Sequence, residues 1–406
     1  MIHPLRGMKD FMFHESRQYV HIITTAIGVA QKYGYSYIET PILEETALFK
    51  RSVGESSDIV GKEMYQFQDK GGNDVCMRPE GTAGVVRAYL SAKLDRQQGK
   101  HKFYYYGPMF RYERPQKGRL RQFHQFGCES FGEASVYEDF TVIQMLSQIF
   151  ETLGIRHTLL INSLGCPTCM PAYRERLVGY LEGVQEVLCD DCQRRIQTNP
   201  IRTLDCKNEH CQTHVHDAPR ITHSLCDACS HDFEQLQSLL DAANIAYTVD
   251  PNLVRGLDYY TKTAFEFVST EIGAQSAIAG GGRYDRLVEF LDGKPTPAIG
   301  FAMGIERIMG IVSLPEPERD GYYIGAMVPE ALPEVLKIAA HKRRTHTVTV
   351  AYAPKGFKGH MKGAEKAHAR YAVLIGDEEL KQETLWEKDL QEQTERTLSI
   401  GAWSSH

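Results

Sequence analysis

The sequence feature that most constrains the fold is a cationic segment, residues 111–121, between two aromatic runs. Five of its eleven residues are Arg or Lys, only one is acidic, and Pro115 and Gly118 interrupt it, which predicts a loop. The flanking residues 102–106 and 122–126 are rich in Phe and Tyr and predict strands. The segment therefore predicts an antiparallel hairpin. Its tip suits a polyanion such as a nucleotide phosphate or an RNA end, although a solvated surface hairpin carries the same charges.

Composition sets further limits on the chain. Its 406 residues are too many for one ordinary domain, and 42% hydrophobic with 24% charged residues is typical of a globular protein with a large core. The net charge of -6 excludes a general nucleic-acid coat, so any RNA binding has to rest on local basic patches. The most apolar early stretch, residues 20–30, is far shorter than the ~20 residues of a membrane span, and no secretory pattern precedes it. We therefore expect a cytoplasmic protein.

Hydrophobic periodicity divides the chain into an interrupted core and a last domain. Apolar residues at spacings of three and four predict a helix over residues 14–33, followed by a strand that ends at Pro41. Together with the strand-like pattern of residues 63–132, this predicts an α+β fold: an antiparallel sheet flanked by helices, with an insertion and a C-terminal α/β domain. The expected parts are a core at 1–164 and 244–314, a Cys-rich insertion at 165–243, and a domain at 321–406 after a Pro-containing linker.

Four sequence blocks occur in an informative order: Phe-Arg-Tyr-Glu with Gln-Phe-His-Gln at 110–113 and 122–125, then residues 255–261, 279–285 and 300–307. The first resembles motif 2 of the class II aminoacyl-tRNA synthetases. The second and third are similar to the two histidine-specific signatures of the histidyl-tRNA synthetases, and the fourth resembles class II motif 3. The resemblance covers nearly the whole chain, and it implies a catalytic core, an insertion and an anticodon-binding domain.

The resemblance implies a binding site for ATP. An aminoacyl adenylate forms when a carboxylate attacks the α-phosphorus of ATP, and fixed cations lower the barrier as charge builds on the phosphoryl oxygens. Arginine suits this because it stays charged and can hold phosphate oxygens with two nitrogens. Mg²⁺ would bridge the phosphates. The resemblance assigns the α-phosphate to Arg111, the far phosphates to Arg307, adenine stacking to Phe123, the adenine amino group to Glu113, and further phosphate contacts to Arg119 or Arg121.

Arg255 is a charged residue in the otherwise apolar and aromatic stretch 253–260, so it needs a partner. From the residues alone, that partner could be Asp258 or Glu266 in an ordinary ion pair. The resemblance implies instead that Arg255 faces the α-phosphate and the substrate carboxylate. It would then act with Arg111 as a catalytic cation.

The resemblance also implies a histidine pocket, which must recognise an imidazole ring, an α-amino group and a carboxylate. Donor groups such as ammonium and imidazole N–H are matched by oxygen acceptors. The expected residues are Glu80 and Thr82 at the α-amino group, Gln125 at the polar end, Glu129 and Tyr260 at the ring nitrogens, and Tyr259 and Tyr284 as walls. The glycines at 280–282 would let the backbone approach the ligand closely, although they could equally form a bulge or turn.

Residues 321–376 alternate between strand and helix patterns and predict a small α/β domain with a largely parallel sheet. A helix is expected over 356–369. Lysine or arginine recurs every fourth residue along it, which predicts a cationic stripe that contacts tRNA phosphates or a solvated face: Lys358, Lys362, Lys366 and Arg370.

Eight of the ten cysteines lie between residues 166 and 229. Such clustering favours metal ligation or reduced structural thiols over disulfides. The CxxC spacings predict a structural zinc site at Cys189, Cys192, Cys226 and Cys229, with Cys206 or Cys211 as substitutes and His210, His214 and His223 nearby. The synthetase family does not require a metal in this insertion, so plain reduced cysteines remain the alternative.

Taken with the resemblance, the sequence predicts an enzyme that uses ATP to join L-histidine to its cognate tRNA. Residues 14–41 look like class II motif 1, which forms a dimer interface in that family, so the resemblance implies a homodimer; the segment alone favours an ordinary helix–strand pair. A second reading is a synthetase-like regulatory subunit that binds histidine without charging tRNA. Such relatives usually lack the terminal domain and some catalytic residues. A third, a zinc-ribbon nucleic-acid module, explains only the insertion.

Overall fold

The structure is a computed structural model of the chain. It describes residues 2–54, 57, 59–113, 119–206, 208–257, 259–272, 277–315 and 318–404. The middle of the cationic loop, residues 114–118, and Asp258 lie outside these ranges. The chain forms two compact units, Met1–Leu314 and Pro315–His406.

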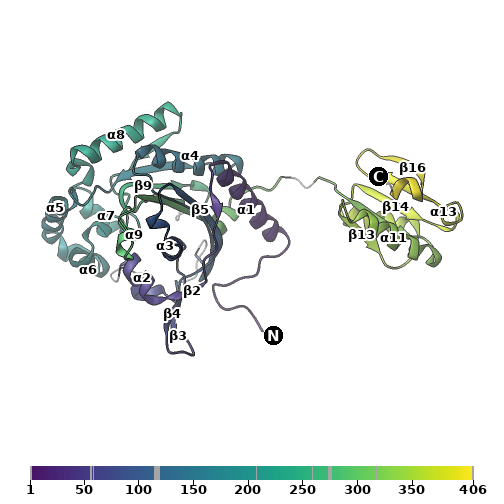
Figure 1. The fold of residues 1–406 in the computed structure, drawn as a ribbon, viewed down its shortest axis with the longest axis horizontal. Helices are drawn as coiled ribbons and strands as arrows, with labels where there is room; N and C mark the ends of the chain where they lie inside the picture. The colour runs from purple at the N-terminus through teal and green to yellow at the C-terminus, as the bar shows by residue number, and fades with distance from the viewer. Residues whose placement is uncertain are drawn as a thin grey trace. The chain divides into compact units, whose positions relative to one another are not determined.

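The first unit is built on an eight-stranded sheet in the order β1-β5-β6-β11-β10-β9-β7-β8. Strands β5 and β9 of this sheet are labelled in Figure 1. Strand β1 is parallel to β5, and β8 is parallel to β7, while every other neighbouring pair is antiparallel. The strands span Ser36–Tyr37 (β1), His101–Phe110 (β5), Gln122–Phe131 (β6), Thr158–Ser163 (β7), Tyr247–Val249 (β8), Thr261–Val268 (β9), Ala277–Arg283 (β10) and Ala298–Gly304 (β11). The predicted α+β class and the hairpin on either side of the cationic loop are therefore confirmed.

Long helices cover one face of this sheet. Helices α1 (His14–Lys32), α4 (Val136–Thr152) and α8 (Asp227–Ala242) bury apolar side chains such as Ile22 and Phe150 against strand residues such as Phe265. Helix α1 matches the helix expected from its apolar spacing, and it ends just before Gly34, whose φ of +81° is a conformation that glycine adopts readily.

Shorter elements cover the opposite face and shape a cavity there. Helix α3 (Thr82–Ser91) and α9 (Leu287–Phe290) pack around a second apolar cluster that includes Tyr105, Tyr259 and Tyr284. A small sheet in the order β2-β4-β3 adjoins them. Its elements and the remaining short helices are β2 (Leu43–Glu45), α2 (Thr46–Val53), a π-helical turn (Ile59–Glu63), β3 (Gln66–Gln68), β4 (Asp74–Met77) and α10 (Ile305–Met309).

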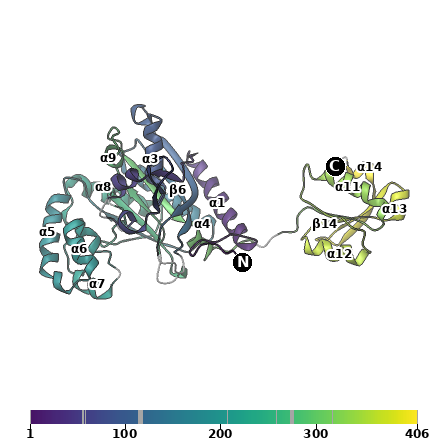
Figure 2. The ribbon, with the colours of Figure 1, turned by 90° about the horizontal axis from the view of Figure 1, so that it is seen from below.

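The insertion between β7 and β8 is helical (Figure 2). Helices α5 (Met170–Gly183), α6 (Asp190–Thr198) and α7 (Glu209–Val215) surround a separate buried cluster in which cysteines lie beside Tyr173, Leu177 and Leu181. Helix α8 then leads the chain back to the core. The insertion therefore has an interior of its own, to which cysteine side chains contribute beside the apolar ones.

The second unit is a five-stranded sheet in the order β13-β12-β14-β15-β16. The first three strands are parallel, as expected, but β15 and β16 add an antiparallel hairpin that the sequence analysis did not predict. The elements are β12 (Tyr322–Ala326), α11 (Leu332–Lys342), β13 (Val348–Ala351), α12 (Phe357–Lys366), β14 (Tyr371–Ile375), α13 (Asp377–Lys381), β15 (Thr384–Asp389), β16 (Thr394–Ser399) and α14 (Ile400–Ser404).

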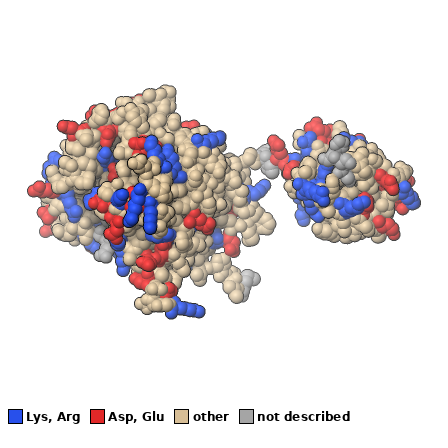
Figure 3. Space-filling model, in the orientation of Figure 1, with Lys and Arg blue, Asp and Glu red and all other residues tan. Residues whose placement is uncertain are grey.

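The cationic stripe of this unit is shorter than predicted. Helix α12 ends at Lys366, and His368 follows with a φ of +53°, which turns the chain away from the helix axis. Arg370 therefore lies beyond the helix, where its Nε is 3.3 Å from Asp389 Oδ2. Lys358, Lys362 and Lys366 remain on α12. Figure 3 shows Lys and Arg side chains gathered on part of this unit's visible face.

Across the described ranges, every helix is too short or too polar to cross a lipid bilayer.

Candidate active site

A cavity of about 250 Å³ opens in the first unit, between the N-terminus of α3 and strands β6, β9, β10 and β11. Eleven of the residues predicted from the sequence to form the site line it: Glu80, Thr82, Arg111, Glu113, Arg119, Phe123, Gln125, Arg255, Tyr259, Tyr260 and Arg307. These residues come from segments as far apart as positions 80 and 307, so folding brings together what the sequence blocks separate.

Three arginines of the cavity lining act on one another electrostatically: Arg111, Arg119 and Arg307. Arg111 donates from Nε to the carbonyl of Pro79 at 2.9 Å, and its guanidinium lies 5.2 Å from the centre of the Phe123 ring. Arg307 donates to the carbonyl of Ala277 at 2.6 Å. Burial lowers the pKa of Arg307, and the positive charges of Arg119 and Arg111 lower it further. Arginine stays protonated despite such shifts, so the three cations form a site that an anion would stabilise.

The loop beside this cluster holds the other two predicted ATP residues. Glu113 pairs with Arg119, with 3.1 Å between Oε2 and Nη1. Arg121 does not line the cavity: its guanidinium lies 3.7 Å from the centre of the Tyr112 ring, and its Nε donates to the carbonyl of Glu113 at 3.3 Å. Of the two residues predicted to offer a phosphate contact, Arg119 lines the cavity, whereas Arg121 packs on the base of the loop. The phosphate contact itself stays a prediction.

Arg255 meets a carboxylate at the cavity wall. Its Nη1 lies 2.7 Å from Oε2 of Glu266, and both residues line the cavity. The side chain is only 18% exposed, and among the described residues its Nε has no hydrogen-bond partner. Of the two partners suggested by the sequence, Glu266 pairs with Arg255, and Asp258 lies outside the described residues. The ion pair does not remove Arg255 from the cavity, so pairing and ligand binding are compatible.

Other polar groups that line the cavity could bind an amino acid. The buried carboxylate of Glu80 accepts hydrogen bonds from the backbone N–H groups of Thr82 (2.6 Å) and Ala83 (2.9 Å) at the start of α3. Burial raises the pKa of Glu80. Oε1 of Gln125 is buried and has no hydrogen-bond partner among the residues described. A buried acceptor without a partner costs free energy, so a donor on a ligand would be stabilising there.

Glu129 and Tyr284 lie one layer behind the cavity lining. The Glu129 carboxylate accepts hydrogen bonds from the hydroxyl groups of Tyr284 (2.5 Å), Thr82 (2.7 Å) and Tyr105 (3.4 Å). It is 1% exposed, and burial raises its pKa to about 8. An added Cβ at Gly300 would fall 1.8 Å from Glu129 Oε2, so this packing requires glycine. Neither residue is among those that line the cavity, so the ring contact predicted for Glu129 and the wall predicted for Tyr284 stay predictions.

Sequence reasoning did not assign two charged residues of the lining. Glu266 alternates with Phe265 and Phe267 along β9, so its charge stands out in an apolar strand. Glu306 precedes Arg307, and its carboxylate accepts the backbone N–H of His124 at 2.9 Å and lies 2.8 Å from His124 Nδ1. It thereby ties α10 to β6 under the cavity. The sequence signal that could have identified both residues is a carboxylate within one of the four family blocks, or a few residues after one.

The predicted metal ligand set is wrong in its grouping. The sulfur atoms of Cys189 and Cys192 do not meet those of Cys226 and Cys229. Instead, Cys189 and Cys192 group with Cys206 and Cys211, and Cys226 and Cys229 group with Cys166 and Cys169. The reason is topological: each group unites segments that the helices of the insertion bring together, whereas spacing alone does not distinguish one CxxC pair from another.

Comparisons with known proteins agree over the whole chain. Residues 7–308 match the family model described as histidyl-tRNA synthetase. A histidine–tRNA ligase of Sulfurovum sp. (strain NBC37-1) is 69% identical over 98% of this chain and 99% of that protein. One from Sulfurimonas denitrificans is 60% identical over 98% and 99%. The crystal structure of the apo S. aureus histidyl-tRNA synthetase has a TM-score of 0.84 at 35% identity, covering 100% of this chain and 99% of that one.

Proposed function

Because the chain belongs to the histidyl-tRNA synthetase family, we infer that it is a histidine–tRNA ligase of class II. It joins L-histidine to its cognate tRNA through a histidyl-adenylate and releases AMP and pyrophosphate. The observation that carries the mechanism is the convergence of Arg111, Arg255 and Arg307 on one cavity that also holds Gln125 and Glu80.

In the activation step, a carboxylate oxygen of histidine attacks the α-phosphorus of ATP. The bond from that phosphorus to the bridging oxygen breaks, and pyrophosphate leaves with the electron pair. Negative charge is shared among the phosphoryl oxygens as the two anions approach. Fixed cations that are already in place stabilise this charge without reorganisation. We assign this role to Arg111 and Arg255, whose guanidinium groups are held by Pro79 and Glu266 respectively.

ATP would occupy the arginine-rich part of the cavity. Phe123 offers an aromatic face for adenine, and Arg111 lies over the same ring. Arg307 and Arg119 would contact the outer phosphates, and Glu113 would accept from the adenine amino group while paired with Arg119. Arg121 packs on Tyr112 and would support this loop from its base.

Mg²⁺ accompanies ATP chemistry and usually takes one or two carboxylates together with phosphate oxygens. The cavity offers carboxylates of this kind at Glu266 and Glu306, so the donor set fits the ion. When bound, Mg²⁺ would neutralise phosphate charge. The arginines act beside it by fixing the orientation of the phosphates.

Histidine would lie against α3, Gln125 and the tyrosines of residues 259–260. Glu80 and Thr82 would hold its α-amino group, Gln125 its polar end, and Tyr260 a ring nitrogen. Glu129 would act on the ring side through Thr82 and Tyr284, to which it is hydrogen-bonded. A pocket that leaves polar groups unpaired without the right ligand discriminates strongly against apolar analogues.

We further propose that the residues of the second unit bind the anticodon end of tRNA, with the lysines of α12 contacting its phosphates. Residues 1–164 and 244–314 would then form the catalytic core, 165–243 the insertion and 321–406 the anticodon-binding domain. The cytoplasm is the proposed compartment, because translation uses charged tRNA there.

A homodimer is proposed from the motif 1-like segment. Apolar side chains on this segment or directly after it are exposed: Val20, Tyr37, Ile42 and Leu43. Exposed apolar residues on neighbouring elements are typical of a protein interface, and a second copy is the commonest partner. Sedimentation equilibrium of the purified chain tests this; a monomer at micromolar concentration contradicts it.

The regulatory-subunit reading is not favoured. Relatives named histidine–tRNA ligase match the chain over nearly its full length, terminal domain included. ATP–pyrophosphate exchange, with each of the protein amino acids in turn, tests the assignment. We expect exchange that requires histidine and Mg²⁺. Exchange with another amino acid and not with histidine contradicts the assignment, and histidine binding without any exchange favours the regulatory reading.

A further inference from the structure

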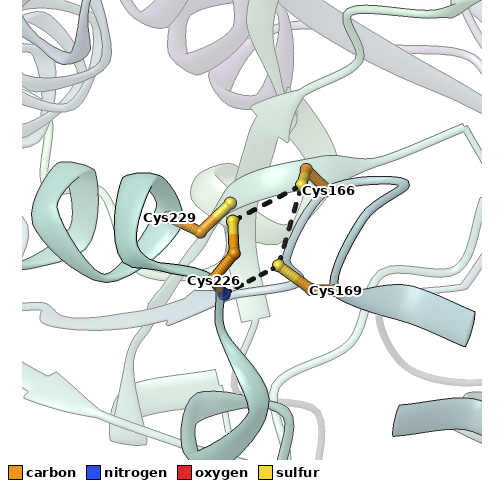
Figure 4. Close-up of side chains that lie close together, drawn as sticks. All are labelled: Cys166, Cys169, Cys226 and Cys229. Carbon is orange, nitrogen blue, oxygen red and sulfur yellow. Dashed lines mark hydrogen bonds between the residues drawn. The ribbon is translucent and has the colours of Figure 1, made fainter. Parts of the chain in front are cut away.

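The cysteines of the insertion form two separate groups of four. One comprises Cys166, Cys169, Cys226 and Cys229, and the other Cys189, Cys192, Cys206 and Cys211. Within each group, all four sulfur atoms lie within 4.8 Å of one another. Figure 4 shows the first group, in which the four side chains converge from the segment after β7 and from the start of α8.

The sulfur separations match a single tetrahedral ion. Sγ of Cys166 lies 3.7 Å from that of Cys169 and 3.8 Å from that of Cys226. In the second group, Sγ of Cys189 lies 3.9 Å from that of Cys206. Four thiolates around Zn²⁺ at about 2.3 Å stand roughly 3.8 Å apart. A disulfide would need about 2.05 Å, and all of these cysteines are free. The centres are too small for a multi-iron cluster.

Backbone amides support the thiolates in the same way in both groups. The N–H of Cys226 donates to Cys169 Sγ at 3.1 Å, and the N–H of Cys189 donates to Cys211 Sγ at 3.2 Å. In each case, the donor is a cysteine that caps the N-terminus of a helix, α8 or α6. Such donors stabilise negative sulfur and orient it toward a metal, as the outer shell of metal sites generally does.

We propose that the insertion holds two structural Zn²⁺ ions, one in each group of four cysteines. The first group, from Cys166 to Cys229, is called the neck site, and the second, from Cys189 to Cys211, the inner site. Zn²⁺ is the fitting ion because four sulfur ligands in tetrahedral array suit it and leave no open position for catalysis.

The two sites are nested along the chain, and each has a clear structural task. The inner site closes a local loop around α6 and α7. The neck site joins the strand that leaves the core to the helix that returns to it. Next to it, Gly165 accepts a hydrogen bond from the backbone N–H of Lys262 at 2.7 Å, so the neck is also attached to β9. The metals would add to the stability of the insertion, since metal binding contributes directly to folding in such domains.

The neck site borders the active site. A second cavity, of about 460 Å³, lies between insertion and core, and both Cys166 and Arg255 line it. Arg202 of the insertion donates to the carbonyl of Gly256 at 2.7 Å. The neck ion would therefore fix the position of a wall that touches the segment carrying Arg255, although the metal itself takes no part in the chemistry.

The test is metal stoichiometry in the full-length protein, purified without chelator and without added metal. Plasma mass spectrometry should find about two equivalents of zinc per chain. Cys226→Ser should lose one equivalent and keep the inner ion, and Cys206→Ser should lose the other and keep the neck ion. Cys76→Ser changes a buried cysteine outside both groups and should keep both. When Co²⁺ replaces Zn²⁺, the protein should show the visible absorption of Co²⁺ bound tetrahedrally by four thiolates. Cys226→Ser and Cys206→Ser should each show about half the absorbance of the wild type.

A second measurement does not depend on folded variants. Wild-type protein can be titrated stepwise with a mercurial that reacts with thiols. About two equivalents of zinc should be released, one for every four of the eight ligand cysteines that react. Less than ~0.1 equivalent of zinc, with all ten thiols reacting freely in the unfolded protein, overturns the proposal. The proposal is also overturned if the wild type holds one equivalent of zinc and both Cys226→Ser and Cys206→Ser lose it. That result would mean a single ion shared by the two groups. Iron in place of zinc also overturns the proposal.

Discussion

Gly280 lies directly beneath the guanidinium of Arg255: a Cβ added at residue 280 would come within 2.3 Å of Arg255 Nη1 and 2.4 Å of Nη2. The glycine-rich strand β10 therefore gives Arg255 the space to reach both Glu266 and the cavity. The position of Arg255, the proposed catalytic cation, therefore depends on the lack of a side chain at residue 280 of the neighbouring strand.

Gly280→Ala should therefore displace the Arg255 guanidinium. We expect the guanidinium to move and histidyl-adenylate formation to fall by ~10-fold or more, because displacement of a positioned group by ~1 Å can cost on the order of 10²-fold. Thermal stability should change little, since the clash is with the end of a flexible side chain. The control is Gly179→Ala in α5, where nothing lies within 4 Å of the new Cβ. Equal rates for both variants would contradict this account.

Glu129 should make stability depend on pH. Its pKa in the folded protein, raised by burial from 4.5 to about 8, favours the protonated form. The stabilisation is therefore complete below the unfolded pKa and is lost as the pH rises toward 8. Glu129→Gln keeps a neutral side chain at all pH values. The unfolding free energy of the wild type should fall relative to that of Glu129→Gln between about pH 5 and about pH 8.

Urea denaturation across that range measures this difference, with the exposed Glu182→Gln as the control that should follow the wild type. A constant difference between wild type and Glu129→Gln would mean that Glu129 is ionised at neutral pH in the folded protein.

Removal of the second unit should separate the two half-reactions. Because Met1–Leu314 forms its own compact unit and contains every described residue that lines the active-site cavity, residues 1–314 alone should retain histidine-dependent pyrophosphate exchange. The catalytic efficiency of tRNA charging should fall by about tenfold or more, because the KM for tRNA rises. A tenfold loss of affinity corresponds to about 1.4 kcal/mol of binding free energy. Undiminished charging by a truncated protein of unchanged oligomeric state would refute a role for this unit in tRNA binding.

The lysines of α12 should bind tRNA phosphates. Lys358, Lys362 and Lys366 replaced together by Ala should raise the KM for tRNA while pyrophosphate exchange stays constant. For every phosphate that the variant no longer neutralises, the slope of log affinity against log salt should become shallower by about 0.7–0.9. Lys337→Ala on α11, a 77% exposed lysine beside Glu334, is the control. An unchanged salt slope in the triple variant would show that this face of α12 is only solvated.

The sequence predicted the elements whose patterns are local. Helix α1 follows from apolar spacing, and the β5–β6 hairpin from aromatic strands around a turn-forming loop. Most of the cavity residues could be named because they fall in family blocks, whereas Glu80, Thr82 and Arg119 lie outside those blocks and were named from the resemblance as a whole. Contacts between distant segments were harder: the partition of eight cysteines depends on how α5 to α8 fold together, and nothing in a CxxC spacing encodes that choice.

Burial depth was also beyond the sequence. Glu129 carries the residue type expected at a histidine-binding position, yet its carboxylate is enclosed by Thr82, Tyr105 and Tyr284. Likewise, the four-residue spacing of Arg370 from Lys366 continues the stripe only if the helix continues. The left-handed turn at His368 ends that regularity, and Arg370 pairs with Asp389 of β15 instead.

The central claim is that Arg255 stabilises charge as the adenylate forms. Its ion pair with Glu266 offers a purely structural alternative, which Glu266→Gln helps to distinguish: this variant removes the pair's negative charge and leaves the arginine. If Arg255 served only as a partner, Glu266→Gln and Arg255→Ala would impair the enzyme alike. If Arg255 acts on the phosphate, Arg255→Ala should form the adenylate much more slowly than Glu266→Gln.

The most direct measurement is the single-turnover rate of histidyl-adenylate formation in Arg255→Ala, at saturating ATP and histidine. We expect a decrease of ~10²–10³-fold, the usual effect of removing one donor that acts in the transition state. The dissociation constants for ATP and histidine should remain within a few-fold of wild type. A rate within a few-fold of wild type, in a variant that folds and binds both substrates, would contradict the account and leave Arg255 as the structural partner of Glu266.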